Sequence, residues 1–185
     1  MAGRTLGYAL RIDVDADPAR VWSALTTDAK LARWLSSNAR ISAREGGSFR
    51  GSVDRETELL AHIDVFAPAR RLRLIHLPSP ALPAGETAIV DDLLLEPRGA
   101  QTLVRVLGSG FPQGVQYEMP LRRHQAGWRL SLARLKVYLE KNLDAAGGGA
   151  GLQHNADAAG SGARPGATDG VIDILGAYGA GDGAK

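Results

Sequence analysis

The sequence predicts an α+β fold in which one antiparallel sheet is covered by a long C-terminal helix. Three observations support this fold class: an alternating strand followed by two short helices, a series of strand-like runs, and a single long amphipathic segment at the end. A sheet with one apolar face must bury it, and only the last segment is large enough to do so. A curved sheet wrapped around one helix is expected to leave a cavity between them.

The N-terminal elements have clear local signals. Apolar residues alternate over residues 6–14, which is the period of a half-buried strand. Asp17-Pro18 combines an N-cap acceptor with the residue favoured at the first helical position, so a short helix begins there. Thr27 or Asp28 can cap a second helix, whose apolar face holds Leu31, Trp34 and Leu35.

The middle of the chain predicts a meander of strands. Six short runs lack helical periodicity and are separated by turn residues such as Gly46-Gly47, Pro68 and Arg98-Gly99. The predicted strands cover residues 41–44, 48–53, 58–66, 71–77, 87–96 and 102–107.

Helical periodicity returns after these strands. A stretch from Pro120 to Leu143 predicts one long helix, because large apolar residues recur at spacings of 4, 3 and 4, at Trp128, Leu132, Leu135 and Leu139.

Composition divides the chain into a domain over residues 1–144 and a flexible tail over residues 145–185. The tail contains 12 glycines and 11 alanines among its 41 residues, so burial cannot offset its ordering entropy. One exception is the segment 170–176, which is apolar enough to dock on its own domain or on a partner, although a segment with no role has the same composition.

Composition also excludes several kinds of chemistry. The chain has no cysteine, which rules out disulfides, thiolate zinc sites, iron–sulfur clusters and cysteine nucleophiles. A net charge of +2 gives little support for a nucleic-acid partner. No apolar run is long enough for membrane insertion and no secretory pattern opens the chain, so a cytoplasmic location is expected.

The four histidines offer no metal-ligand spacing, so no metal and no cofactor is predicted; they are His62, His76, His124 and His154. His124 lies one helical turn before Trp128, and His76 shares a strand face with Leu72 and Leu74. Both imidazoles are therefore expected to face the cavity, where they would orient a polar group or act as acid and base. The alternative is that each histidine is simply hydrogen-bonded and takes part in no chemistry.

Asp91 and Asp92 are neighbours on a predicted strand, so their side chains point to opposite faces and cannot form an acid–base pair. The sequence favours an edge or solvent-facing role for these charges. The alternative is that one of them faces the cavity and pairs with Arg105 of the next strand.

Several motifs resemble the START-like helix-grip superfamily, also called SRPBCC. Their order is most similar to the family of homologues of the activator of the heat-shock-protein-ninety ATPase, over about residues 8–143. The motifs are Asp17 to Thr26, Trp34, Glu45 to Phe49, Pro68 to Leu72, Thr102, the turn at Ser109-Gly110-Phe111, and Gly127-Trp128 with the leucines after it. At His76 the family commonly has tryptophan, so the cavity here is expected to be more polar or roomier.

This resemblance implies a helix-grip domain that binds a small hydrophobic or amphipathic ligand between the sheet and the C-terminal helix. The expected ligand-binding residues are Trp34, His76, Phe111, His124 and Trp128. Ordinary core packing explains the aromatic residues equally well. Two further functions stay open: a cyclase- or hydrolase-like enzyme for aromatic polyketide-type substrates, using His76 or His124, and a co-chaperone-like module that binds a chaperone or another protein.

Overall fold

The computed structural model describes residues 4–141, except positions 56, 83 and 86, together with residues 170–173. Its elements, in chain order, are β1 (Thr5–Val14), α1 (Pro18–Thr26), α2 (Asp28–Trp34), β2 (Arg40–Ile41), β3 (Ser48–Ser52), β4 (Glu58–Ala67), β5 (Arg71–His76), β6 (Val90–Arg98), β7 (Gln101–Pro112), α3 (Val115–Glu140) and β8 (Gly170–Asp173).

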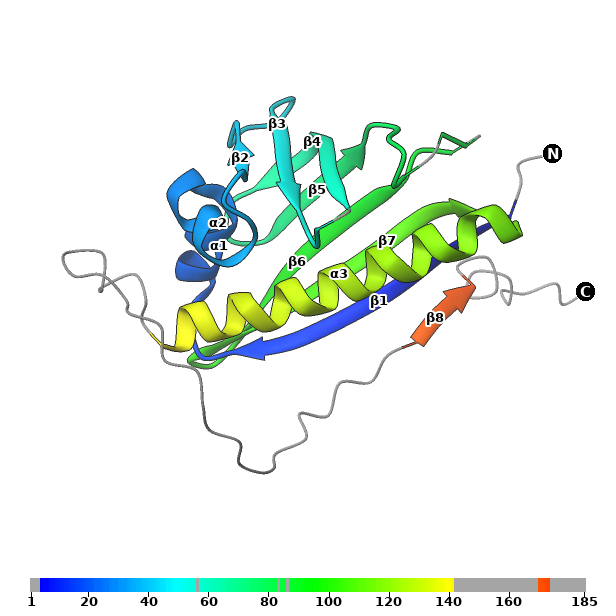
Figure 1. The fold of residues 1–185 in the computed structure, drawn as a ribbon. Coiled ribbons are helices and arrows are strands. Elements are labelled where there is room, and N and C mark those ends of the chain that lie inside the picture. The colour runs from blue at the N-terminus through cyan, green and yellow to red at the C-terminus, as the bar shows by residue number, and fades with distance from the viewer. Residues whose placement is uncertain (1–3, 56, 83, 86, 142–169, 174–185) are drawn as a thin grey trace, which may run out of the picture.

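The strands form one sheet with the order β2-β3-β4-β5-β6-β7-β1-β8. Every neighbouring pair is antiparallel. Figure 1 shows α3 lying along the sheet over β7 and β1, with α1 and α2 near the C-terminal end of α3. The predicted fold class is therefore confirmed: a curved antiparallel sheet holds one long helix.

The helix starts follow from local chemistry. The Asp17 carboxylate accepts hydrogen bonds from the backbone N–H groups of Ala19 and Arg20 at 2.9 and 3.0 Å, so it caps α1 as expected. The start predicted for the long helix was wrong, because α3 begins at Val115 and includes Pro120. Pro120 has no backbone N–H to donate to the carbonyl four residues earlier, and this missing bond falls in the second turn of α3.

The end of β7 differs from the prediction as well. Ser109-Gly110-Phe111, expected as a turn, lies inside β7. Leu6 pairs with Phe111 and Tyr8 pairs with Gly108, so Ser109 and Gly110 together oppose a single residue of β1. Gly110 takes a φ of +87°, and this β-bulge extends the strand where a turn was read.

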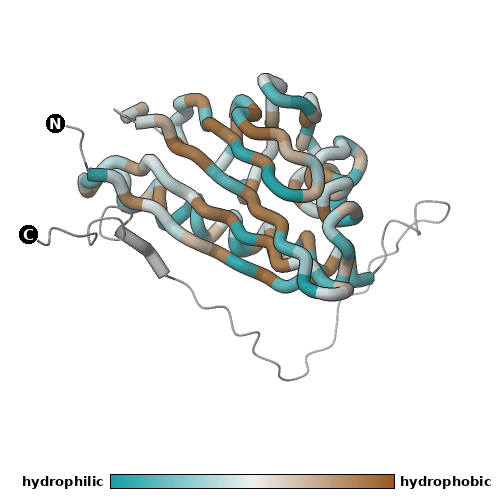
Figure 2. The backbone as a smooth tube through the Cα atoms, turned by 180° about the vertical axis from the view of Figure 1, so that it is seen from behind, coloured by the Kyte–Doolittle hydropathy of each residue, from teal (hydrophilic) through white to brown (hydrophobic). Residues whose placement is uncertain are grey.

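The core lies between the sheet and the helices. Buried and partly exposed residues alternate along β5 and β6, and hydrophobic and hydrophilic positions are interspersed along the strands (Figure 2). Helix α3 buries one face that contains Leu121, Trp128, Leu132, Leu135 and Leu139. These side chains fill the space beneath the centre of α3, since each is at most 3% exposed.

Most of the predicted tail lies outside the described residues. Its segment 170–173 forms β8 and pairs with β1 from Leu6 to Ala9, so this part docks on its own domain. Within the part of the chain that the structure describes, no helix combines the length and the apolarity needed to cross a bilayer.

Candidate functional site

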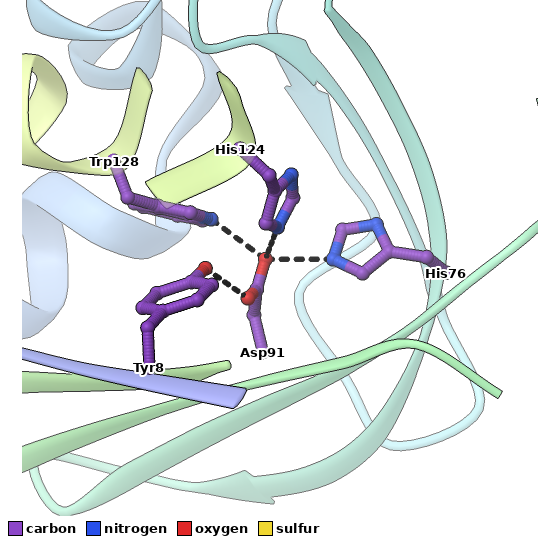
Figure 3. Close-up of polar contacts among 5 residues, drawn as sticks. All are labelled: Tyr8, His76, Asp91, His124 and Trp128. Atoms are coloured by element: carbon purple, nitrogen blue, oxygen red, sulfur yellow. Dashed lines mark hydrogen bonds and ion pairs between the residues drawn. The ribbon is translucent and has the colours of Figure 1, made fainter. Parts of the chain in front are cut away.

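A buried carboxylate, Asp91, is the centre of the site, and three other elements direct side chains toward it (Figure 3). Asp91 shares the inner face of β6 with Leu93 and Leu95. His76 ends β5 on the inner face of that strand. Tyr8 comes from β1, and α3 contributes a histidine and a tryptophan one turn apart, His124 and Trp128.

One oxygen of the carboxylate accepts three hydrogen bonds. Asp91 Oδ2 lies 2.7 Å from His76 Nε2, 2.8 Å from His124 Nε2 and 2.6 Å from Trp128 Nε1. The Tyr8 hydroxyl donates to the other oxygen, Oδ1, at 2.7 Å. We call these five residues the Asp91 network. Because an ionised carboxylate can only accept, each histidine must carry a hydrogen on Nε2.

A glycine in β7 allows Tyr8 to reach the carboxylate. Gly108 lies between Tyr8 and Asp91 in the sheet, since it pairs with both. A Cβ at position 108 would lie only 2.1 Å from the Tyr8 ring. The absence of a side chain there lets the tyrosine cross β7 and place its hydroxyl on Asp91.

Burial and hydrogen bonding shift the ionisation of both oxygen acids in the network. Burial by itself raises the pKa of Asp91, but the charges of His124 and His76 when protonated, and their hydrogen bonds, outweigh burial and hold that pKa far below its usual range. Burial, followed by the charge of Asp91 and the hydrogen bond to it, raises the pKa of Tyr8 well above its ordinary value. The network therefore contains an ionised carboxylate and a neutral phenol at neutral pH.

His76, Asp91 and His124 also offer three ligand atoms within 4.8 Å of one another, a spacing that metal sites use. The hydrogen-bond geometry does not fit a cation. A metal needs nitrogen lone pairs, whereas both Nε2 atoms donate to Oδ2, and the Trp128 N–H occupies the same oxygen. The two histidines and Trp128 are instead arranged as hydrogen-bond donors to the Asp91 carboxylate.

A hollow of about 230 Å³ adjoins the network at His76. We call it the His76 hollow; it is lined by His76, Leu77, Pro78, Leu82, Ala84, Gly85, Thr87, Ala88 and Ile89. His76 Nδ1 is buried and has no hydrogen-bond partner. A second, more polar hollow of about 350 Å³ shares Thr87 and includes Arg4 and Tyr117.

The structure brings four of the five predicted site residues together. The ring centroids of His76 and His124 are 5.2 Å apart, and those of Phe111 and His124 are 5.6 Å apart. Trp128 donates to Asp91, the same carboxylate that both histidines contact. Trp34 instead donates its indole N–H to the carbonyl of Ala24 in α1, at 3.0 Å. Among the three hollows found in the part of the chain that the structure describes, His76 lines one and the other four predicted residues line none.

The solvent-facing role expected for Asp91 was wrong, because its side chain is fully buried. The alternative pairing with Arg105 was wrong too: Arg105 contacts Glu96 at 3.0 Å, and Asp92 accepts from Arg71 at 2.8 Å. Tyr8 was read only as a strand residue. Periodicity gave no signal for Asp91, because Leu93 and Leu95 share its parity while Val90 and Leu94 share that of Asp92.

Comparison with known proteins agrees with this architecture. A family model described as Activator of Hsp90 ATPase homolog 1-like protein matches residues 15–140. No curated protein matches the chain.

Solved structures share the fold at low sequence identity. The Aha1 dimer of Colwellia psychrerythraea has 20% identity and a TM-score of 0.61, with 72% of this chain and 96% of that chain covered. A Mesorhizobium loti protein has 20% identity and a TM-score of 0.59, covering 72% and 97%. CalU16 of Micromonospora echinospora has 24% identity and a TM-score of 0.56, covering 71% and 73%. With the family match over most of the domain, these findings show that the chain belongs to the family of Activator of Hsp90 ATPase homolog 1-like proteins.

Proposed function

We propose that the protein binds a small hydrophobic or amphipathic molecule in the His76 hollow. The observation that carries this proposal is an apolar hollow with one buried polar side chain on its wall, the combination typical of small-molecule sites. Leu82 and Ile89 supply buried apolar contacts, and the buried His76 forms the wall that adjoins the Asp91 network. Because side chains fill the space beneath the centre of α3, the ligand binds beside the end of β5.

An enzymatic role has less support from the geometry. An acid–base pair needs two groups that reach the substrate. Both Nε2 atoms of His76 and His124 are already bonded to Asp91, and His124 is fully buried. Binding without chemistry therefore agrees better with the arrangement.

The test is a thermal-shift titration with 1-decanol, combined with native mass spectrometry. Saturable binding at 100 times Kd stabilises the folded state by about 2.7 kcal/mol and raises Tm by about 5 °C or more. Ala88→Trp fills the hollow from its exposed rim and should abolish the shift. Ala29→Trp, the same change at an exposed position of α2, is the matched control and should keep it. No shift in the wild type across apolar alcohols and aromatics would refute the proposal.

A second candidate function, binding of a protein partner, is favoured by the outer face of α3. Leu130 and Val137 are 54% and 46% exposed. Together with two exposed alanines they form a row along α3 whose members are 4, 3 and 4 residues apart. We call this row the α3 stripe; it consists of Ala126, Leu130, Ala133 and Val137. A row with this spacing fits a second helix, and small residues allow close approach. Four exposed arginines lie on the same helix, at Arg122, Arg123, Arg129 and Arg134, so an acidic amphipathic helix is the complementary partner.

Two designed peptides test this candidate. Both carry apolar residues at heptad spacing, one with glutamate flanks and one with lysine flanks. The glutamate peptide should bind in a salt-dependent manner, and Leu130→Glu should remove the binding. Equal affinity for the two peptides, or no binding of either, would contradict the candidate.

A further inference from the structure

We infer that the partner of the α3 stripe is an acidic helix that lies along the whole of α3 and repeats its apolar residues every 11 residues, not every seven. This inference rests on the second candidate function and specifies the length, the pattern and the charge of the partner helix. It follows from the exposed apolar side chains of α3, from their spacing and from the charges beside them.

Exposed apolar side chains continue the α3 stripe to the start of the helix. Among the residues that the structure describes, five large hydrophobic side chains are exposed, and four of them are on α3. Two of these belong to the stripe, and the other two are Val115 and Met119, which are 80% and 63% exposed. We call the stripe together with these two residues the long α3 row. From Val115 to Val137 it extends about 33 Å, which is about six turns of a partner helix.

The members of the long α3 row recur every 11 residues. Val115, Ala126 and Val137 have this spacing, and so do Met119 and Leu130. On an α-helix, positions 11 residues apart differ in direction by only about 20°, so the row stays on one side of α3 along its length. The whole row lies within about 60° around the helix axis, at about 100° per residue.

A seven-residue repeat does not describe this surface. Continued at heptad spacing from Val115, the seam would pass through Arg129 and Lys136. The 11-residue repeat passes through Leu130 and Val137 instead. Heptad repeats impose a left-handed supercoil, whereas 11-residue repeats impose a slightly right-handed one. A partner helix therefore contacts both ends of the row only if its own apolar residues follow the 11-residue repeat.

The width of the row and the charges beside it indicate what kind of partner fits. An apolar helix face that packs on a broad hydrophobic surface spans at least about 100°, and a narrower row is typical of a seam between two helices. Four exposed arginines flank the row, two on each side: Arg122 and Arg129, and Arg123 and Arg134.

The acidic residues of α3 do not balance these arginines. There are two of them, Glu118 and Glu140, and Glu140 is paired with Lys136 at 2.6 Å. A second copy of α3 would bring arginines against arginines, whereas glutamates beside the seam of a partner helix complement them. The row therefore favours an acidic helix over a second copy of this chain.

Calorimetric titration of the full chain with two glutamate-flanked peptides of 26 residues, the length of α3, tests the inference. The peptides have the same composition, and their leucines follow the 11-residue repeat in one and the heptad repeat in the other. We expect the 11-residue peptide to bind about tenfold more tightly, because the heptad peptide can follow only one half of the row. Met119→Gln removes an apolar contact without adding charge and should weaken the 11-residue peptide about tenfold. Met119→Leu is the matched control and should keep the affinity.

The outcomes separate this inference from the candidate function. Equal affinities, or tighter binding of the heptad peptide, would overturn the inference and leave the α3 stripe as a site for a helix. Binding of neither peptide would overturn both, and binding of phosphatidylserine vesicles in that case would assign the row to a membrane surface. A dimer of the full chain that Leu130→Glu dissociates would assign the row to a second copy and overturn the inference as well.

Methyl NMR of the full chain gives a readout that needs no variant. The 11-residue peptide should shift the methyl signals of Val115, Met119, Leu130 and Val137 together, because it contacts the row from end to end. Shifts confined to Leu130 and Val137 would overturn the inference.

Discussion

Replacing Asp91 by asparagine should destabilise the protein strongly, although the two side chains have nearly the same shape. The carboxylate accepts four hydrogen bonds, three on Oδ2 and one on Oδ1. In Asp91→Asn the amide oxygen can take the Oδ2 position, because an NH2 group there would face three donors. The amide NH2 then faces Tyr8, whose hydroxyl can rotate to accept. The substitution therefore keeps the bonds and removes the charge.

The magnitude follows from that difference. A hydrogen bond to a charged group contributes about 1.5–3 kcal/mol and one between neutral groups about 0.5–1.5 kcal/mol, so four bonds lose about 4–6 kcal/mol in total. Removing a buried charge returns part of its desolvation penalty. We expect a net loss of about 2–4 kcal/mol in the free energy of unfolding.

Urea unfolding followed by circular dichroism at pH 7 measures this loss. Asp92→Asn is the matched control, since Asp92 is the next residue, points to the other face of β6 and pairs with a partly exposed arginine, Arg71. A partly exposed ion pair of this kind is worth about 1 kcal/mol. If Asp91→Asn lost no more stability than Asp92→Asn, the reasoning about the Asp91 network would be refuted.

Three further predictions concern acid, Gly108 and the tail. Because folding lowers the pKa of Asp91, the contribution of its charge to the free energy of unfolding is complete above about pH 4 and is lost as the pH falls further. The difference in unfolding free energy between wild type and Asp91→Asn should therefore shrink in urea titrations from pH 7 to pH 3. Gly108→Ala should lower the free energy of unfolding by about 3 kcal/mol, because the new methyl group clashes with the Tyr8 ring. In a double-mutant cycle, Tyr8→Ala should remove part of this loss, and additive losses of the two substitutions would contradict the prediction. Deleting residues 145–185 should leave Tm nearly unchanged but speed amide exchange in residues 6–9, which β8 pairs; unchanged exchange would argue against that pairing in solution.

Periodicity in the sequence was enough to predict the fold class and the order of the elements, with bounds within one residue for β3, β4 and β5. The alternation around Tyr8 and the 4-3-4 spacing around Trp128 each reflect one buried face, so local pattern and tertiary structure agree there. The pattern failed at Gly110, where a residue typical of turns forms a bulge inside β7. Pairing with β1 decides between these two outcomes, and pairing is not a local property.

The site was predictable only in part, for a related reason. His76 and His124 could each be placed on a buried face, and the structure does bring them together. Asp91 could not, because β6 carries apolar residues at both parities: Val90 and Leu94 share one face, Leu93 and Leu95 the other. A strand that is apolar on both faces does not reveal which of two adjacent carboxylates points inward.

The Asp91 carboxylate has two structural effects, and both come from the bonds that its Oδ2 atom accepts. Its bonds to His124 and Trp128 hold α3 against the sheet, so it contributes to the packing of the core. Its bond to His76 turns the free nitrogen of that ring away from the network. A change at Asp91 therefore removes the acceptor that all four donors share, whereas a change at His76 leaves three of the four donors in place. Variants of Asp91 are for this reason the ones that measure how strongly the core depends on the whole network, and variants of His76 measure the contribution of one donor.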